Sequence, residues 1–170
     1  MVPGMSLSDF TTLHVVIGLI GIATGFIWLF AAANARSVPG WTAAFLLTTV
    51  ATSVTGFLFP NLKIGPPVIF GVISLVVLTP AVLALYRYRL AGPWRWISIA
   101  GGAFALYLNS VVGVVQAFQK LTFLNALAPT QSEPPFLAAQ GIVLMIVVGL
   151  TAVALKRFHP GSAPSTSAQM

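Results

Sequence analysis

The 170-residue chain contains no cysteine, and only two of its residues are acidic. The absence of cysteine excludes a disulfide framework, a thiolate metal site and a cysteine nucleophile. Charged residues of both signs make up 6% of the chain, against roughly 25% in an ordinary soluble domain. So little charge cannot cover a soluble surface, and the high apolar content excludes a disordered chain. With 58% hydrophobic residues and a mean hydropathy of +0.98, the composition predicts an integral membrane protein.

The net charge of +6 and the pI of about 10.6 would also suit a nucleic-acid-binding protein. The basic residues, however, stand singly or in pairs between apolar runs and form no stripe with interleaved aromatic residues. This placement is typical of charges that flank membrane spans. We therefore expect no nucleic-acid partner.

Five apolar runs are long enough to cross a hydrocarbon core, which takes about 20 helical residues. They cover residues 13–33, 41–59, 67–86, 94–118 and 136–155. The sequence thus predicts an all-α polytopic membrane protein, with a five-helix transmembrane domain over residues 1–158 and a disordered tail over 159–170. We expect the first run to be retained, because no basic residue precedes it and it is longer than the apolar part of a signal peptide.

The basic residues divide unequally between the two sides of such a bundle. Lys63 and Lys120 fall on one side, and the other six fall on the opposite side. The excess of Lys and Arg marks the cytoplasmic side of a membrane protein. We therefore expect the N-terminus outside and the C-terminus inside. The six inner residues are Arg36, Arg87, Arg89, Arg95, Lys156 and Arg157.

The first predicted helix carries His14, Gly18, Gly21 and Gly25 at spacings that place them on one face. Gly21 and Gly25 also form a G-x-x-x-G pair, which lets another helix approach closely. The favoured interpretation is a packing seam with a hydrogen-bonded histidine at its outer end. The alternative is that His14 is a ligand or a proton carrier.

The second predicted helix is rich in hydroxyl side chains, with Thr48, Thr52 and Thr55 on one face. Hydroxyls inside a helix can donate to the carbonyl four residues earlier, so this face needs no polar partner. We expect it to pack against another helix, and the alternative is that it lines a polar cavity.

The fourth predicted helix carries Asn109, Gly113, Gln116 and Lys120 along one stripe. An amide cannot satisfy all its donors and acceptors within its own helix, so Asn109 and Gln116 should point into the bundle. They either specify helix packing, together with Gly113, or bind a ligand.

Most polar side chains of the predicted spans fall in the outer half of the membrane. We predict that the first, fourth and fifth spans enclose an outward-facing ligand pocket there, covered by the long connection over residues 119–135, with Glu133 paired to Lys120. Apolar walls with a few convergent polar groups are typical of a small-molecule site. The candidate ligand-binding residues are His14, Thr52, Thr55, Asn109, Gln116, Lys120, Glu133 and Gln140.

Catalytic and metal chemistry find little support. The spacing of Asp9, His14 and Glu133 matches no metal-ligand motif, and no G-x-S-x-G nucleophile elbow occurs. The two histidines, His14 and His159, lie at opposite faces of a core that is roughly 30 Å thick, so one chain cannot ligate a haem with both. A symmetric dimer could share a haem between two copies of His14.

Three stretches of the chain, residues 41–60, 106–120 and 127–140, resemble an uncharacterised family of small, mainly proteobacterial integral membrane proteins with no known activity. This resemblance implies a bacterial inner-membrane location. The H-x-x-x-G-x-x-G pattern at residues 14–21 also resembles small haem-binding membrane bundles, which need a second histidine that this chain lacks.

We therefore expect a non-enzymatic membrane protein. It would bind a lipid or lipophilic molecule from the outer side, or act as an accessory subunit of a membrane complex. The alternatives are a small homo-oligomeric channel or transporter, and a haem- or quinone-binding redox protein. Membrane lipids, a second copy of the chain or a larger membrane complex are the expected partners.

Overall fold

The computed structural model describes residues 6–60 and 65–159, and this part of the chain is entirely helical with no strand. The prediction of an all-α fold is therefore confirmed. Lys63 and the predicted tail beyond His159 lie outside the described residues. The helices are α1 (Leu7–Ala33), α2 (Pro39–Gly56), α3 (Pro66–Tyr86), α4 (Trp94–Lys120), α5 (Thr122–Leu127) and α6 (Pro134–Arg157).

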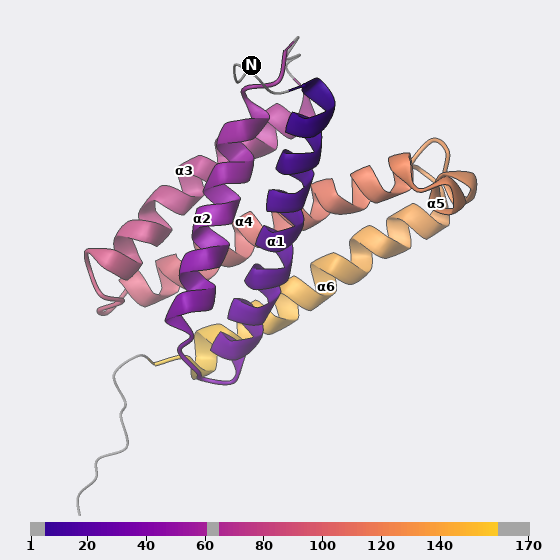
Figure 1. Ribbon diagram of the computed structural model, residues 1–170. Helices are drawn as coiled ribbons and strands as arrows, with labels where there is room; N and C mark the ends of the chain where they lie inside the picture. The colour runs from indigo at the N-terminus through magenta and orange to yellow at the C-terminus, as the bar shows by residue number, and fades with distance from the viewer. Residues whose placement is uncertain (1–5, 61–64, 160–170) are drawn as a thin grey trace, which may run out of the picture.

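The five long helices follow one another in alternating directions, so α1 begins at one end of the bundle and α6 finishes at the other (Figure 1). α1 packs most extensively on α2, and α3 on α4. α4 contacts each of the other five helices, whereas α6 packs mainly against α4 and α1. We call the end formed by the α1–α2 loop, the α3–α4 loop and the C-terminus of α6 the basic end.

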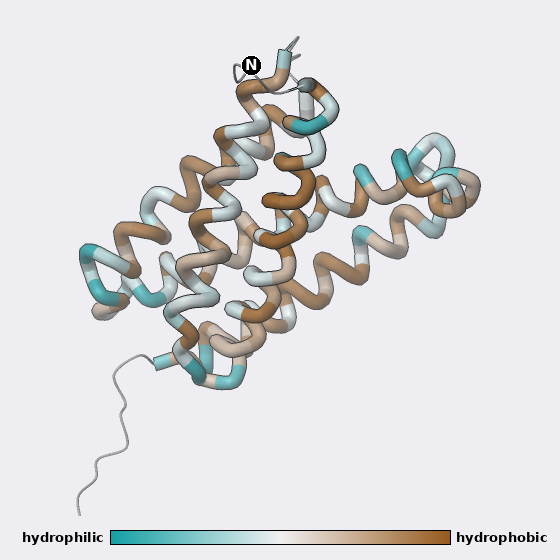
Figure 2. The backbone as a smooth tube through the Cα atoms, in the orientation of Figure 1, coloured by the Kyte–Doolittle hydropathy of each residue, from teal (hydrophilic) through white to brown (hydrophobic). Residues whose placement is uncertain are grey.

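Four of the described helices are long and apolar enough to cross a membrane: α1, α3 from Val68, α4 and α6. Hydrophobic residues run along these helices and hydrophilic residues gather at their ends (Figure 2). α2 is not in this set, because Thr, Ser, Gly and Pro make up much of its 18 residues. Of the four, α4 is the most buried and α6 the most exposed.

Two glycines allow the aromatic core to form between α1, α2 and α4. The Trp28 ring stacks on Phe45 with centroids 5.2 Å apart and planes 16° apart. A Cβ atom at Gly25 would lie 2.6 Å from Leu106 Cδ1 and 2.8 Å from Phe45 Cδ2. A Cβ atom at Gly102 would lie 2.6 Å from Trp28 Cη2. These distances are far below the roughly 3.5–4.0 Å of a normal carbon contact, so both positions require glycine.

The predicted glycine face of α1 lies against neighbouring helices. A Cβ atom at Gly18 would lie 3.5 Å from Thr52 Cγ2, and one at Gly21 would lie 3.2 Å from Thr48 Oγ1, both on α2. A Cβ atom at Gly113 of α4 would lie 3.0 Å from Ile22 Cδ1. Along α1 the glycine face therefore packs first on α2, at Gly18 and Gly21, and then on both α2 and α4, at Gly25.

Candidate functional site

His14 is held by α2 rather than by the helices that were predicted to share its pocket. Its Nδ1 lies 2.8 Å from Thr55 Oγ1, and its ring meets Phe59 edge to face with centroids 5.2 Å apart. Thr55 Oγ1 donates its own hydrogen to the carbonyl of Ala51 at 2.7 Å. Because that hydroxyl proton is already used, Nδ1 of His14 carries the proton in this bond, which leaves Nε2 as the acceptor nitrogen.

The amide side chains that were predicted to share this pocket also bind different partners. Asn109 Nδ2 makes a long hydrogen bond of 3.4 Å to Thr49 Oγ1 on α2. Gln140 Nε2 donates to the carbonyl of Val111 on α4 at 3.3 Å, and its Oε1 is buried without a partner in the described structure. Gln116 is half-buried. The amides thus connect α4 to two different neighbours and do not converge.

The connection over residues 119–135 packs against the ends of the two helices that it joins, α4 and α6. Asn125 donates to the carbonyl of Phe118 at 3.2 Å, and Gln131 donates to the carbonyl of Val115 at 3.1 Å. Phe118, Ala128 and Phe136 form a small separate core beneath them. α5 lies against α4, away from the outer ends of α1 and α2 (Figure 1). The expectation that this connection covers a shared pocket was therefore wrong.

Glu133 is engaged within the loop before α6. Its Oε1 accepts hydrogen bonds from the backbone N–H and the hydroxyl of Thr130, at 3.1 and 2.9 Å, and its Oε2 accepts one from the Ser132 N–H at 3.0 Å. Partial burial acts to raise the pKa of Glu133, but the hydrogen bonds outweigh it and lower the pKa. The predicted ion pair with exposed Lys120 does not form in the described structure.

Of the eight predicted ligand-binding residues, His14 and Thr55 contact each other. None of the eight lines either of the two cavities described below. Thr52, for example, donates to the carbonyl of Thr48 at 2.8 Å and sits against Gly18. Within the described residues, no three His, Cys, Asp or Glu side chains lie close enough together to hold a metal ion.

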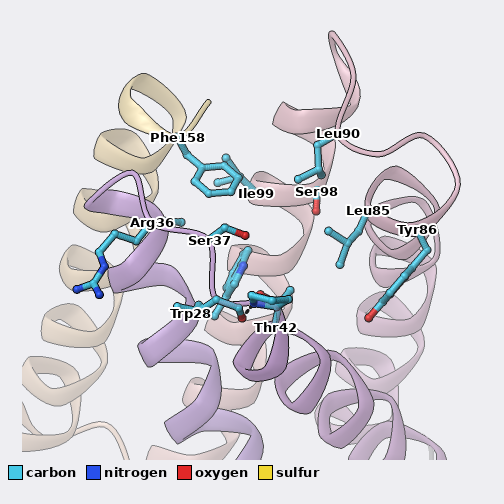
Figure 3. A pocket seen from close by; sticks show the side chains of 13 residues that line it. Trp28, Arg36, Ser37, Thr42, Leu85, Tyr86, Leu90, Ser98, Ile99 and Phe158 are labelled. Carbon is cyan, nitrogen blue, oxygen red and sulfur yellow. Dashed lines mark hydrogen bonds between the residues drawn. The ribbon is translucent and has the colours of Figure 1, made fainter. Parts of the chain in front are cut away.

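A cavity of about 210 Å³ lies at the basic end of the bundle, opposite the predicted pocket (Figure 3). Its walls come from the last turns of α1 and α3, the first turns of α2 and α4, the α1–α2 and α3–α4 loops and the residue after α6. The lining is mainly apolar and aromatic. It consists of Trp28, Ala32, Arg36, Ser37, Val38, Pro39, Thr42, Leu85, Tyr86, Leu90, Ser98, Ile99 and Phe158.

Several polar groups on this wall make no hydrogen bond to any described residue, among them the indole N–H of Trp28 and the hydroxyls of Ser37 and Ser98. Thr42, by contrast, donates to the carbonyl of Val38 at 2.9 Å. The Trp28 indole N–H is not among the buried side-chain atoms that lack a partner in the described structure, so it is open to the cavity. An apolar wall with a few uncommitted polar groups has the composition of a binding site for a small amphipathic group.

Arg95 fixes one wall of the cavity. Its Nη1 donates to the carbonyls of Leu155 and Phe158, at 3.0 and 2.5 Å, where the last carbonyls of α6 lack helical partners. A cation at a helix C-terminus is also favoured by the helix dipole. Arg95 therefore acts as a positioning residue that holds Phe158 against the cavity.

The two loops at the mouth contain strained backbone. Ala35, Arg89 and Leu90 have φ values of 57°, 50° and 59°, in the left-handed region that costs a non-glycine residue roughly 1–2 kcal/mol. Tyr88 stacks on Trp94 with centroids 3.8 Å apart and planes 5° apart, which closes the α3–α4 loop. Strain of this kind concentrates at functional sites and is compatible with a binding role here.

Sequence reasoning missed the residues of this cavity. Trp28 carried one available signal, since it lies inside the first apolar run, whereas Trp41, Trp94 and Trp96 lie at the ends of runs where interfacial tryptophans are expected. Ser37, Ser98 and Phe158 carry no such signal.

No protein-family model, curated protein or solved structure matches this chain. Its function is therefore inferred from its own residues and their geometry.

Proposed function

We propose that all five long helices cross a membrane, including the less apolar α2. Its 18 residues span about 27 Å at 1.5 Å per residue, close to the roughly 30 Å of a hydrocarbon core. Its hydroxyl side chains are satisfied locally, because Thr42, Thr48, Thr52, Ser53 and Thr55 each donate to the carbonyl four residues earlier. A helix with such hydroxyls loses little on entering hydrocarbon.

The proposed orientation places the basic end in the cytoplasm and the start of α1 outside. Six of the chain's eight basic residues belong to the basic end, and both acids, Asp9 and Glu133, belong to the other. This asymmetry follows the positive-inside rule. Together with the family resemblance, it supports a bacterial inner-membrane location. Reporter fusions at the two termini test the orientation, and a C-terminal reporter that is active outside would refute it.

We further propose that the protein is a non-enzymatic lipid-binding protein whose site is the cavity at the basic end. The observation that carries this proposal is the cavity itself, with its apolar wall and its uncommitted Trp28, Ser37 and Ser98 groups. Its volume of about 210 Å³ is below the range of roughly 300–1,000 Å³ for whole-ligand pockets. It would therefore hold one end of an amphipathic molecule whose remainder lies in the membrane. Binding from the inner side replaces the outer-side binding expected from the sequence.

Native mass spectrometry of the gently extracted protein tests this proposal with a matched pair of variants. Ser98→Phe fills the cavity from α4, whereas Ala100→Phe adds the same ring two residues away at an exposed position of the same helix. We expect bound lipid on the wild type and on Ala100→Phe, and a much weaker lipid signal on Ser98→Phe. Equal lipid binding by both variants would refute the site.

An accessory-subunit role is a second candidate, favoured by the exposure of α6. A Cβ atom at Gly141 or Gly149 would have no neighbour within 4 Å. Met145, between them, is 68% exposed. The small residues would let a helix of a partner subunit approach this side closely. A Gly149→Leu substitution should weaken such an assembly, and an unchanged complex size in mild detergent would refute it.

A further inference from the structure

We propose that the lipid is an anionic phospholipid of the surrounding membrane, with its phosphate at the mouth of the cavity and one acyl chain in a groove between α2 and α3. This inference rests on the proposed function and adds to it the class of lipid and the path of its chain. Two observations carry it: a second hollow lies further along the same face of α3, and the charges at this end of the bundle are all positive.

The second hollow has a volume of about 280 Å³ and an almost entirely apolar lining. Its polar exception, Thr79, donates its hydroxyl to the carbonyl of Leu75 at 2.8 Å, so the hydroxyl needs no further partner. A hydrocarbon chain is the occupant that such a surface accepts without an unsatisfied polar group. The lining residues are Val50, Leu75, Leu78, Thr79, Val82 and Leu83.

The groove and the cavity follow one another along the same face of α3. Leu78 and Val82 line the groove and Leu85 lines the cavity. Their spacing of i, i+4 and i+7 places them in one row on the helix. From Leu85 to Leu78 the row is about 10 Å long at 1.5 Å per residue. A molecule with its polar end in the cavity would therefore find an apolar surface for its chain further along the same face of α3.

The charges at the mouth favour an anion. Arg36 is one of the lining residues, and its guanidinium turns away from the centre of the cavity (Figure 3). Arg87 and Arg89 belong to the α3–α4 loop, next to Leu90 of the cavity wall. Each basic residue near a membrane surface contributes about 1 kcal/mol towards anionic lipid, which is roughly a fivefold preference.

The polar groups of the cavity wall that make no hydrogen bond could also donate hydrogen bonds to the phosphate. The Trp28 indole can only donate a hydrogen bond, and the hydroxyls of Ser37 and Ser98 are able to donate. Phosphate oxygens accept hydrogen bonds and carry the charge that the mouth attracts. A zwitterionic phospholipid also carries a phosphate, but its headgroup cation would meet the positive residues of the mouth. An anionic headgroup avoids that repulsion.

Site-directed quenching tests the path of the chain, and the cysteine-free sequence makes it straightforward. Thr79→Cys places a single bimane fluorophore in the groove, and Val148→Cys places one on the exposed surface of α6, where the native side chain is 56% exposed. Each labelled protein is reconstituted into phosphatidylcholine nanodiscs that contain a minor fraction of acyl-chain doxyl-labelled lipid. The labelled lipid is either phosphatidylglycerol or phosphatidylcholine.

We expect labelled phosphatidylglycerol to quench the Thr79 site several times more strongly than labelled phosphatidylcholine, and both lipids to quench the Val148 site equally. Equal quenching at Thr79 would overturn the inference. An equal phosphatidylglycerol preference at both positions would also overturn it, because it would indicate general enrichment of anionic lipid around the protein.

A pair of charge variants tests the headgroup independently. Arg36→Gln combined with Arg89→Asn removes two charges from the mouth, and Asn tolerates the left-handed backbone of Arg89. The phosphatidylglycerol preference at Thr79 should then be lost, because two charges at about fivefold each account for more than the several-fold difference in quenching. Lys120→Gln, at the other end of the bundle, should leave the preference unchanged, and equal losses in both variants would overturn the inference.

These results separate the two proposals. If Ser98→Phe loses its bound lipid but the Thr79 site shows no lipid preference, the cavity binds a lipid whose chain does not follow the groove, and only the present inference fails. If Ser98→Phe retains the bound lipid, the proposed function fails as well.

Discussion

Gly102 of α4 should be intolerant of even one added methyl group, because the Trp28 ring occupies the space beside it. In Gly102→Ala the new Cβ would lie 2.6, 3.1 and 3.3 Å from three atoms of that ring. A normal carbon contact is roughly 3.5–4.0 Å, so the ring must move by about 1 Å. Phe45 stacks on the ring at a centroid distance of 5.2 Å and limits its retreat. The displaced ring would therefore shift towards the cavity that it lines.

Two opposing contributions determine how much Gly102→Ala changes the free energy of unfolding. Overpacking of a well-packed core costs about 1–3 kcal/mol, whereas replacing glycine by alanine inside a helix gains about 1 kcal/mol in propensity. We therefore expect Gly102→Ala to lose up to about 2 kcal/mol of unfolding free energy. Gly149→Ala on α6 is the matched control, since its Cβ would meet nothing within 4 Å and it gains only the propensity term.

Thermal unfolding in a mild detergent, followed by tryptophan fluorescence, measures the difference. The two variants should differ by about 1–3 kcal/mol, so at roughly 2–4 °C per kcal/mol for a chain of this size Gly102→Ala should melt about 2–12 °C below Gly149→Ala. The same variant should bind less lipid, because Trp28 intrudes on the cavity. If the two alanine variants melt together, the close contact between Gly102 and Trp28 does not exist in the protein and the geometry of the cavity wall is wrong.

Three further predictions concern other contacts. Arg95→Gln should lower the unfolding free energy by about 2 kcal/mol, because it removes the charged donor to two carbonyls at the end of α6; unchanged melting would show that these bonds contribute nothing. Gly21→Leu should separate α1 from α2 and lower the melting temperature, since even a Cβ atom would lie 3.2 Å from Thr48 Oγ1; unchanged melting would mean that this face does not pack. The lowered pKa of Glu133 stabilises its loop above the ordinary value of 4.5, and this contribution should be lost as the pH falls through the lowered pKa. Hydrogen exchange at the Thr130 amide should accelerate over that range relative to Glu133→Gln, and parallel pH dependences in the two proteins would contradict the assignment.

The helices were predictable because apolar runs of this length have few alternatives. The predicted runs 13–33, 67–86, 94–118 and 136–155 each lie inside one helix, and only the run 41–59 extends past the end of its helix at Gly56. The short α5 was not predicted as a separate helix, because its six residues are too few to show a period.

The candidate site was harder to predict, because helical spacing identifies a face but not its neighbour. His14 and Asn109 do point into the bundle, yet both meet hydroxyls of α2, at Thr55 and Thr49. The glycine spacing on α1 likewise indicated a close contact without naming the helix that makes it. The cavity at the basic end depends on four helices, two loops and the residue after α6 at once, so no single periodicity could reveal it.

The most direct test of the lipid-binding cavity is a high-resolution structure of the full chain in nanodiscs formed from its own membrane lipids. We predict elongated density that begins between Trp28, Ser37 and Ser98 and continues along Leu78 and Val82 of α3. A cavity that contains only water or rearranged side chains, with no continuous density reaching the groove, would contradict the account.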